Sequence, residues 1–396
     1  MVKVIMALGS KPLRISDVRE LNEKLVLRLV HSAGRQGISQ SEVVNATGLK
    51  APTIFRIFSV LEEAGYIEAI DKDAPGKDEG VRQERKGRRP VAYAVRSDAF
   101  YCVGIEFWVE RISIGIFDFG GNSLYTRTTS LSRSEDAGRV CDLIVSLVNQ
   151  AIVDSSLPRE RMLGVGIGAP GQVDVGERLV ASYPRIPGMK NYPIADILET
   201  RLGIPVSLHN NCTVIAQSEY HYGSLAVEAS MFMILLRSGV NGAFVDGGRV
   251  FLSPRGTTIE MGHTCIDYDG PLCVCGARGC LEAFMTSMDS ENIRRGNWLF
   301  EGMDPLSSSA DPVLTAASGY LSAAIQTASR LFSPSFFLIL AYSDDIATEL
   351  ARRTETKLSR ETSSFDVSTP RIVGRAYNQD LALRGAADLV LDSFLY

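Results

Sequence analysis

Between residues 21 and 61, apolar residues recur every three or four positions in three segments, a spacing typical of amphipathic helices. A capping box, Ser39-Gln-Ser-Glu42, opens the second helix, and Pro52 suits the first turn of the third. Gly34 and Gly65 are placed to end the first and third helices. The apolar faces that this spacing predicts are Leu21, Leu25, Leu29 and Val30, then Val43 and Val44, then Ile54, Ile57, Phe58 and Leu61.

The second and third helices are separated by a tight turn at Thr47-Gly48, which is the plan of a helix-turn-helix motif. In that motif the later helix lies in the major groove of DNA. Arg56 is suited to bidentate contact with guanine. The residues predicted to face outward from this helix are Thr53, Phe55, Arg56 and Ser59.

A charged stretch follows the third helix, and residues 91–95 then alternate like a strand. Together they predict a hairpin wing whose basic tip, with Arg88 and Arg89, contacts phosphate or the minor groove. Residues 71–84 alone fit a solvated linker equally well, and three-helix units also serve as interaction modules. The basic wing directly after the third helix favours DNA binding.

From residue 101 onward, apolar runs typical of buried strands alternate with amphipathic helices, and the pattern starts again at Met231. Such alternation predicts an α/β protein with two similar lobes and a ligand between them, at the ends of strands. The segments that carry this prediction are 101–107, 111–119, 135–154, 162–168, 191–202 and 205–209, then 231–236, 312–332 and 336–340.

Length and charge both indicate several domains, of which the first is basic. A chain of 396 residues is too long for one ordinary core. Residues 1–98 hold 17 Lys and Arg against 13 Asp and Glu, whereas the whole chain holds 41 against 46. A basic segment on an acidic body indicates that only the first part meets an acidic polymer. Because no apolar run approaches the ~20 residues of a membrane helix and no signal peptide is recognised, we expect a cytoplasmic protein with no membrane partner.

Cysteine usage indicates a metal site. Cys273, Cys275 and Cys280 lie within eight residues, and His263 precedes them closely. Three thiols and one imidazole match the four ligands of a tetrahedral, structural zinc, with no position left for water. The alternative is that these Cys are small buried apolar side chains, which their density and the neighbouring glycines disfavour. Cys265 is a possible substitute for His263.

The same region resembles the ROK family of sugar kinases and sugar-responsive repressors. The matching motifs are Glu260-x-Gly-His263, Cys-x-Cys-Gly-x-x-Gly-Cys-Leu-Glu at 273–282, Gly168-Ala-Pro-Gly171 and Asn210-Asn211. The N-terminal helices, with the later Gly87-Arg-Arg-Pro90, resemble the repressor branch. The resemblance implies an actin-like, two-lobed fold of the hexokinase (ribonuclease H-like) type, zinc on a loop beside the sugar, and a homodimer or dimer of dimers.

The resemblance also implies a set of sugar contacts, in which carboxylates and amides bind adjacent hydroxyls. His263 is implied to bind zinc through one nitrogen and to face the sugar with the other. A core role for Asn210 and a surface role for the carboxylates are the alternatives. The residues that fall at the family's sugar-binding positions are Asn210, Asn211, Glu260, His263, Glu282 and Gly171.

Three departures from the kinases of this family bear on catalysis. Asn211 stands where the kinases have the Asp that takes the proton from the sugar hydroxyl, and an amide is no base. The phosphate turn Asp-x-Gly-Gly-Thr corresponds to Glu106-Phe-Trp108-Val109-Glu110, without the glycines that let backbone amides approach phosphate. A Gly-Gly that faces adenosine is replaced by Ala341-Tyr342, while 238–242 keeps some glycine.

These residues predict a sugar-responsive transcriptional repressor that has lost phosphoryl transfer, with operator DNA and a sugar or sugar derivative as partners. An active sugar kinase fused to a DNA-binding domain is the alternative. A regulator controlled by a partner protein, with a vestigial cleft, is a third. The expected domains are a winged helix-turn-helix at 1–97, a first lobe at 98–218 completed by a helix at 378–396, and a second lobe with the zinc loop at 219–377.

Overall fold

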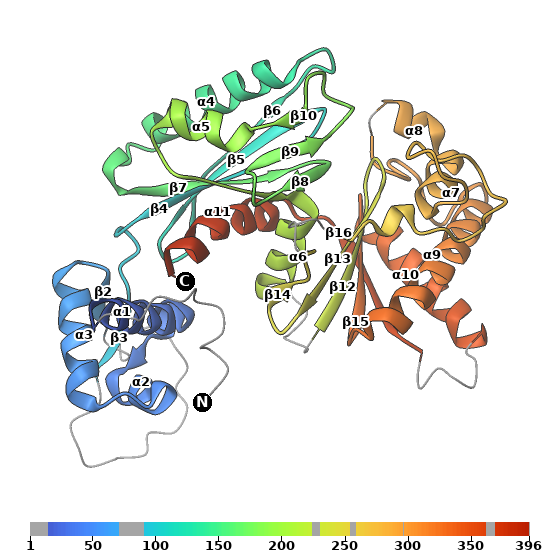
Figure 1. Ribbon diagram of the computed structural model, residues 1–396. Helices are drawn as coiled ribbons and strands as arrows, with labels where there is room; N and C mark the ends of the chain where they lie inside the picture. Colours follow the sequence, from blue (N-terminus) through green and yellow to red (C-terminus); the bar gives the residue numbers. More distant parts are fainter. Residues whose placement is uncertain are drawn as a thin grey trace.

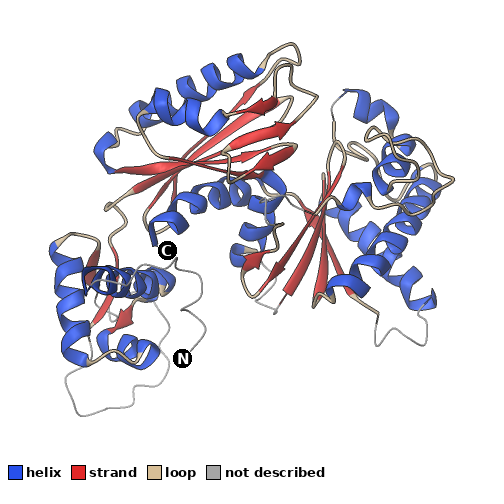
Figure 2. Cartoon of the chain, in the orientation of Figure 1, coloured by secondary structure: helices blue, strands red, loops and turns tan. Residues whose placement is uncertain are grey.

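The fold of this chain comes from a computed structural model, which describes residues 15–70, 91–223, 230–253, 259–295, 297–361 and 369–395. Three bodies follow one another along the chain, an N-terminal unit and two lobes (Figure 1). Each lobe is built on a five-stranded sheet, and helices cover the outer face of each sheet (Figure 2).

The N-terminal unit has the winged helix-turn-helix plan that the sequence predicts. Ser39 caps the second helix in a capping box with Glu42, and Gly48 ends that helix in the left-handed conformation. The apolar face of the third helix consists of the predicted residues. Arg88 and Arg89 lie outside the described residues. The elements are α1 (Ile15–Ser32), β1 (Ile38–Ser39), α2 (Gln40–Thr47), α3 (Ala51–Glu63), β2 (Ile67–Ile70) and β3 (Ala92–Val95), with strand order β1-β3-β2.

The predicted apolar face of α1 is wrong in part. The residues buried on this helix are Val26, Leu27 and Val30, whereas Leu21 is 44% exposed. The reason is that α1 packs against α3, β3 and also against the distant helix α11 (Gln379–Leu395). Contacts on two sides turn the buried stripe away from the line that a single partner would give.

Lobe 1 begins with a three-stranded antiparallel meander, to which two parallel strands are added. The sheet order is β11-β7-β4-β5-β6, and a small sheet β10-β9-β8 extends the lobe. The elements are β4 (Tyr101–Phe107), β5 (Arg111–Asp118), β6 (Ser123–Ser130), α4 (Ala137–Asp154), β7 (Met162–Ala169), β8 (Gln172–Asp174), β9 (Leu179–Ser182), β10 (Lys190–Tyr192), α5 (Ile194–Leu202), β11 (Val206–Asn210) and α6 (Asn211–Tyr222).

Lobe 2 repeats this topology, which confirms the predicted similarity of the lobes. A meander of β12, β13 and β14 is followed by β15, parallel to β12, and β16, parallel to β15. The elements are β12 (Ser230–Leu236), β13 (Val240–Asp246), β14 (Arg249–Val250), α7 (Leu281–Met288), α8 (Ser290–Arg295), α9 (Ala310–Phe332), β15 (Phe336–Ala341), α10 (Asp344–Glu361) and β16 (Arg371–Ala376).

Helix α11 returns from lobe 2 to cover the sheet of lobe 1 on the face opposite α4 and α5 (Figure 1). Its backbone lies directly on the sheet. A Cβ atom at Gly104 would stand 1.9 Å from the carbonyl oxygen of Leu383, and one at Gly166 would stand 1.7 Å from that of Ala386. Only glycine permits this approach, and the packing supports our assignment of 378–396 to lobe 1.

The same helix joins the N-terminal unit to lobe 1 through one apolar core. Val26 and Ile57 of the N-terminal unit and Leu383 and Val390 of α11 belong to a single buried cluster. The Phe394 ring of α11 lies 5.2 Å from that of Phe100 and 6.3 Å from that of Tyr66, between ring centroids. The N-terminal unit is therefore fixed to lobe 1 and not carried on a free linker. No helix within the described ranges is long and apolar enough to cross a membrane.

Candidate functional site

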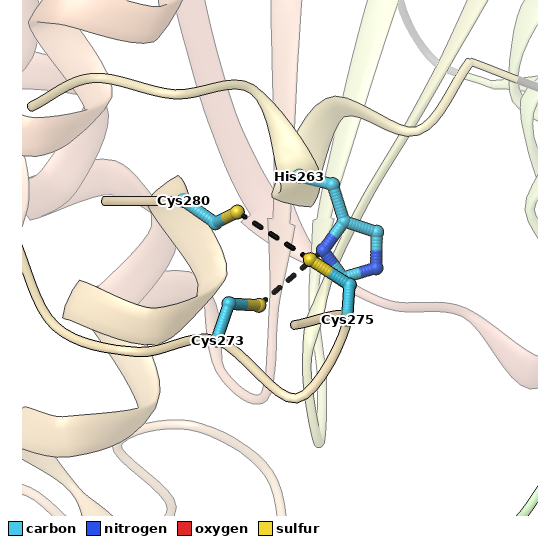
Figure 3. Close-up of side chains that lie close together, drawn as sticks. All are labelled: His263, Cys273, Cys275 and Cys280. Carbon is cyan, nitrogen blue, oxygen red and sulfur yellow. Dashed lines mark hydrogen bonds between the residues drawn. The ribbon is translucent and has the colours of Figure 1, made fainter. Parts of the chain in front are cut away.

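Four side chains with metal-binding atoms converge in the loop between β14 and α7. His263, Cys273, Cys275 and Cys280 each offer one ligand atom, and these atoms all lie within 4.8 Å of one another. Sγ of Cys273 is 3.5 Å from Nδ1 of His263, and Sγ of Cys275 is 3.7 Å from Sγ of Cys280 (Figure 3). Zn–S bonds of about 2.3 Å in a tetrahedron place sulfur atoms about 3.8 Å apart. The set therefore fits a four-coordinate zinc.

Backbone hydrogen bonds fold this loop so that the thiols meet. The N–H of Gly276 donates to the carbonyl of Cys273 at 2.9 Å, in a turn that gives Gly276 a φ of +92°. The backbone of Ala277 lowers the pKa of the Cys275 thiol by hydrogen bonding to it, which favours the thiolate that a metal binds. Burial raises the pKa of the Cys280 thiol to about 12.

Cys265, the sequence alternative to His263, lies apart from the cluster. Its side chain is exposed, and its Sγ is 3.6 Å from the carbonyl oxygen of Arg278. His263 occupies the place among the thiols instead. The geometry thus favours the ligand set that the sequence ranks first.

Two carboxylates stand beside this cluster. Partial burial raises the pKa of Glu260; His263 opposes the shift, Glu282 reinforces it and a hydrogen bond with Gln172 opposes it. Glu282, in the first turn of α7, accepts a hydrogen bond of 2.9 Å from the backbone N–H of Val240. Residues from lobe 1 and lobe 2 therefore meet here, and three of the predicted sugar-binding residues lie together.

Asn210 links the Gly171 loop to the N-terminus of α6. It caps α6, with Oδ1 accepting from the N–H of Cys212 at 2.8 Å, and Nδ2 donates to the carbonyl of Gly171 at 2.6 Å. These bonds tie the Gly171 loop to α6, which is the core role that the sequence left open. Each amide atom still has one hydrogen-bonding position left for a ligand.

Asn211 is the first residue of α6 and is 3% exposed. Its Nδ2 has no hydrogen-bond partner among the described residues. A buried, unpaired donor costs about 1–3 kcal/mol, so an acceptor such as a ligand hydroxyl would be stabilised at this position. The side chain can bind a hydroxyl there but cannot remove its proton.

The turn between β4 and β5, which the family resemblance equates with a phosphate loop, is filled by a cation from lobe 2. The guanidinium carbon of Arg237 lies 4.0 Å from the centroid of the Trp108 ring and 4.7 Å from that of Trp298. Arg237 also forms an ion pair with Glu110. It is 1% exposed, although it is charged. Desolvated cation–π contacts of this kind contribute about 2 kcal/mol, so Arg237 links the two lobes.

Tyr377 extends this cluster toward the start of α11. Its hydroxyl donates to Oε2 of Glu106 at 2.5 Å, and its ring centroid lies 5.1 Å from that of Trp298. Burial raises the pKa of Tyr377, and the charge of Glu106 adds to the shift. Side chains thus occupy the region between the lobes beside the altered turn.

Sequence reasoning missed Arg237, Trp298 and Tyr377. Arg237 did carry a signal, because it directly follows the wholly buried strand β12. A charge at that place needs a partner. Trp298 and Tyr377 carry no such signal, since their contacts depend on how the lobes pack.

The outward face of α3 is as predicted. Phe55 and Arg56 are exposed, and Thr53 and Ser59 are partly exposed. The Ser59 hydroxyl donates to the backbone carbonyl of Phe55 at 3.2 Å. The face therefore offers an aromatic ring and a guanidinium to a partner.

The sequence profile of the ROK family matches residues 102–393 of this chain. The chain belongs to the ROK family. The match covers both lobes, the loop that carries His263 and the three cysteines, and most of α11, and the N-terminal unit precedes it.

Curated relatives include repressors and kinases. The chain is 24% identical over 267 residues to the xylose repressor of Caldicellulosiruptor bescii, a match spanning 67% of this chain and 64% of the repressor. It is 22% identical over 285 residues to the DNA-binding transcriptional repressor Mlc of Escherichia coli, covering 72% of this chain and 67% of Mlc. Glucokinase of Streptomyces coelicolor is 30% identical over 182 residues, 46% of this chain and 55% of the enzyme.

Solved structures confirm the predicted fold. A ROK family transcriptional regulator described as a homologue of E. coli Mlc superposes with a TM-score of 0.76 at 20% identity, covering 96% of this chain and 98% of that one. A ROK glucokinase from Streptomyces griseus, in complex with glucose and AMPPNP, gives a TM-score of 0.61 at 22% identity, covering 74% and 99%. The actin-like, hexokinase-type arrangement of the lobes is therefore the family fold.

Proposed function

We propose that this protein is a sugar-responsive, DNA-binding transcriptional repressor in which phosphoryl transfer has been lost. The observation that carries the proposal is the winged helix-turn-helix unit, built into one apolar core with a lobe that forms part of the family's sugar cleft. The similarity to proteins named xylose repressor and Mlc supports it. A homodimer or dimer of dimers would present two such units to a two-fold operator.

In this proposal α3 enters the major groove and Arg56 contacts guanine, with Thr53 and Ser59 beside it. Arg88 and Arg89 belong to the proposed wing and would contact phosphate or the minor groove, although they lie outside the described residues. Net positive charge on the unit supports this assignment.

The sugar would bind between the lobes, where Glu260, His263 and Glu282 meet the loop of Gly171. Asn210 and Asn211 would hydrogen-bond hydroxyls from the N-terminus of α6. Since xylose repressors are among the relatives and glucokinases share the fold, xylose and glucose are the first sugars to test.

Loss of kinase activity is supported by two features. Asn211 is no base, and Arg237 with Trp108 and Trp298 fills the region that the family's kinases use for phosphates. The glucokinase similarity favours the alternative of an active kinase. We expect no turnover with magnesium ATP and any hexose or pentose, and no recovery in Asn211→Asp alone. Clear turnover by the wild type would establish the alternative.

We also propose that the His263, Cys273, Cys275 and Cys280 cluster holds one structural zinc per chain. The thiol and imidazole donors fit this metal, and four protein ligands leave no position for water. When bound, zinc would supply only a fixed loop geometry. Nδ1 of His263 faces the thiols, so the metal would fix the orientation of this ring in the pocket wall.

The test of the repressor proposal uses the full chain and an operator selected from random duplexes. Sugars, amino sugars and their phosphates are titrated into the protein–operator complex, and fluorescence anisotropy reports the affinity. We expect one of these ligands to weaken operator binding by about 5–150-fold, the usual range of allosteric coupling.

The variant Glu260→Gln should need more sugar for the same effect while its sugar-free operator affinity stays at the wild-type value. Glu260 is preferred to Glu282 because Glu282 also holds the backbone of Val240. Glu291→Gln, on the surface of α8, is the matched control. Equal sugar responses in wild type and Glu260→Gln would show that this cleft is not the sensor.

A further inference from the structure

Helix α3 carries an aromatic side chain on its exposed face. Phe55 is 63% exposed, whereas Ile54, Ile57, Phe58 and Leu61 of the same helix are at most 4% exposed. Phe55 is therefore not part of the core. Single exposed apolar residues are ordinary on protein surfaces. Whether Phe55 has a binding role therefore depends on where it lies.

That position is the face proposed to enter DNA. Arg56 is exposed next to Phe55, and Pro52 and Ser59 continue the same helical face at spacings of three and four residues. The first turn of α3 has no acidic residue, and the exposed Lys50 stands at its N-cap. The acidic residues of the helix, Glu62 and Glu63, lie at its other end, so the surroundings of Phe55 suit a polyanion.

The side chains of this face indicate which DNA base Phe55 would contact. The Ser59 hydroxyl donates to the carbonyl of Phe55, and Thr53 and Ser59 are only partly exposed, so Phe55 and Arg56 are the large exposed side chains of this face. A phenyl ring forms no hydrogen bond with a base edge. The apolar group that the major groove exposes is the C5 methyl of thymine, which cytosine lacks.

We propose that Phe55 reads thymine, with its ring packed on the C5 methyl group of a thymine next to the base pair that Arg56 contacts. This inference rests on the proposed function and assigns a base to the half-site. Phe55 would select thymine by apolar contact, and Arg56 would select guanine by hydrogen bonds.

The experiment uses the full-length protein and its selected operator. Each thymine in one half-site is replaced in turn by deoxyuridine, which removes the methyl group and keeps base pairing. We expect wild-type affinity to fall about fourfold at one position, the value of one buried methyl-sized group, and to change little at the others. Phe55→Ala should bind more weakly than wild type and should bind the thymine and uracil operators equally.

Two variants act as controls. Phe55→Leu keeps an apolar side chain and should retain part of the preference for thymine. Phe251→Ala removes a comparably exposed ring, 53% exposed, from lobe 2 and should leave the preference unchanged. Circular dichroism and thermal melting of Phe55→Ala should match wild type, because the side chain is outside the core.

The outcomes separate this inference from the proposed function. If Phe55→Ala keeps the wild-type ratio of thymine to uracil affinities, or if wild type shows no uracil-sensitive position, the inference is overturned while the repressor proposal stands. If selection with wild-type protein enriches no sequence, the proposed function fails and the inference fails with it.

Discussion

Asp388 lies on α11, where this helix meets Tyr222 of α6 and where Arg384 precedes it by one turn. Burial raises the pKa of Asp388 to about 7, while its hydrogen bond with Tyr222 and the charge of Arg384 oppose the shift. The Arg384 guanidinium lies 3.5 Å from the centroid of the Tyr222 ring. Between its ordinary pKa near 4 and about pH 7, the folded protein keeps a proton that the unfolded chain releases.

Stability should therefore fall as pH rises through this window and level off above it. The variant Asp388→Asn removes the titrating group, so it should stabilise the protein more at pH 8 than at pH 5, relative to wild type. Urea unfolding at both pH values measures the difference. Asp196→Asn, on the exposed part of α5, serves as the control. A variant effect of the same size at both pH values would contradict this account.

Single residues differ in how far sequence alone reveals them. The metal-binding set and the buried face of α3 follow from spacing and side-chain chemistry, which are local. Arg237 and Trp298 come from one lobe and Trp108 from the other, so their contact depends on the packing of lobes, which no local pattern encodes. The buried face of α1 was predicted wrongly for the same reason, because α1 also packs against the distant helix α11.

At the scale of elements, the metal-binding loop has little apolar packing of its own. The small buried cluster within it consists of Cys273, Cys280 and Ala283. Tyr268, Leu272 and Val274 of this loop are exposed. With the proposed zinc bound, such a loop would depend on the metal for a fixed conformation, as metal binding and local folding are coupled.

Protein purified without added metal should contain about one zinc per chain by elemental analysis. Cys275→Ser should lower this content and the affinity for sugar, since one ligand is lost and the orientation of His263 is released. Cys265→Ser changes a neighbouring thiol outside the cluster and should leave both at the wild-type level. Well-folded wild-type protein without zinc would refute the proposed site.

Strongly apolar strands and amphipathic helices were predictable as elements, among them β4, β12, β15 and α9. The small sheet of β8, β9 and β10 was not, because its short strands mix polar and apolar residues. The helix α10 was also missed, although its buried residues Ile346, Leu350 and Leu358 recur at helical spacing among many charged residues. Strand order depends on contacts between residues distant in sequence, which periodicity does not reveal. The family resemblance predicted the two-lobed fold instead.

At the scale of the whole molecule, the N-terminal unit, lobe 1 and lobe 2 meet around one cavity. Its lining includes Arg28 and His31 of α1, Arg384 and Asp388 of α11, and Gly248 of the β13–β14 turn. A shift of lobe 2 relative to lobe 1 would therefore change the shape of a cavity that α1 also lines. This shared cavity gives the proposed sugar response a physical route to the N-terminal unit.

Because the N-terminal unit and α11 share one core, they should lose structure together. Phe394→Ala should lower the free energy of unfolding by about 2 kcal/mol, less than for a fully buried ring. Native-state hydrogen exchange should show faster exchange in α1 and α3 as well as in α11. Leu314→Ala, in the core of lobe 2, is the control and should act mainly on α9 and its neighbours. Unchanged exchange in α1 and α3 of Phe394→Ala would show that the unit folds independently.

The return of α11 to lobe 1 also has a consequence for biosynthesis. A ribosome makes the strands of lobe 1 and the N-terminal helices first, but the helix that covers their shared apolar surface emerges only after all of lobe 2. Until then Gly104, Gly166 and the aromatic ring of Phe100 face solvent or a chaperone. The nascent chain should therefore be unable to complete the core that fixes the N-terminal unit until all of lobe 2 has been synthesised. If the proposed function holds, operator binding would then be delayed until the proposed sugar site has been made.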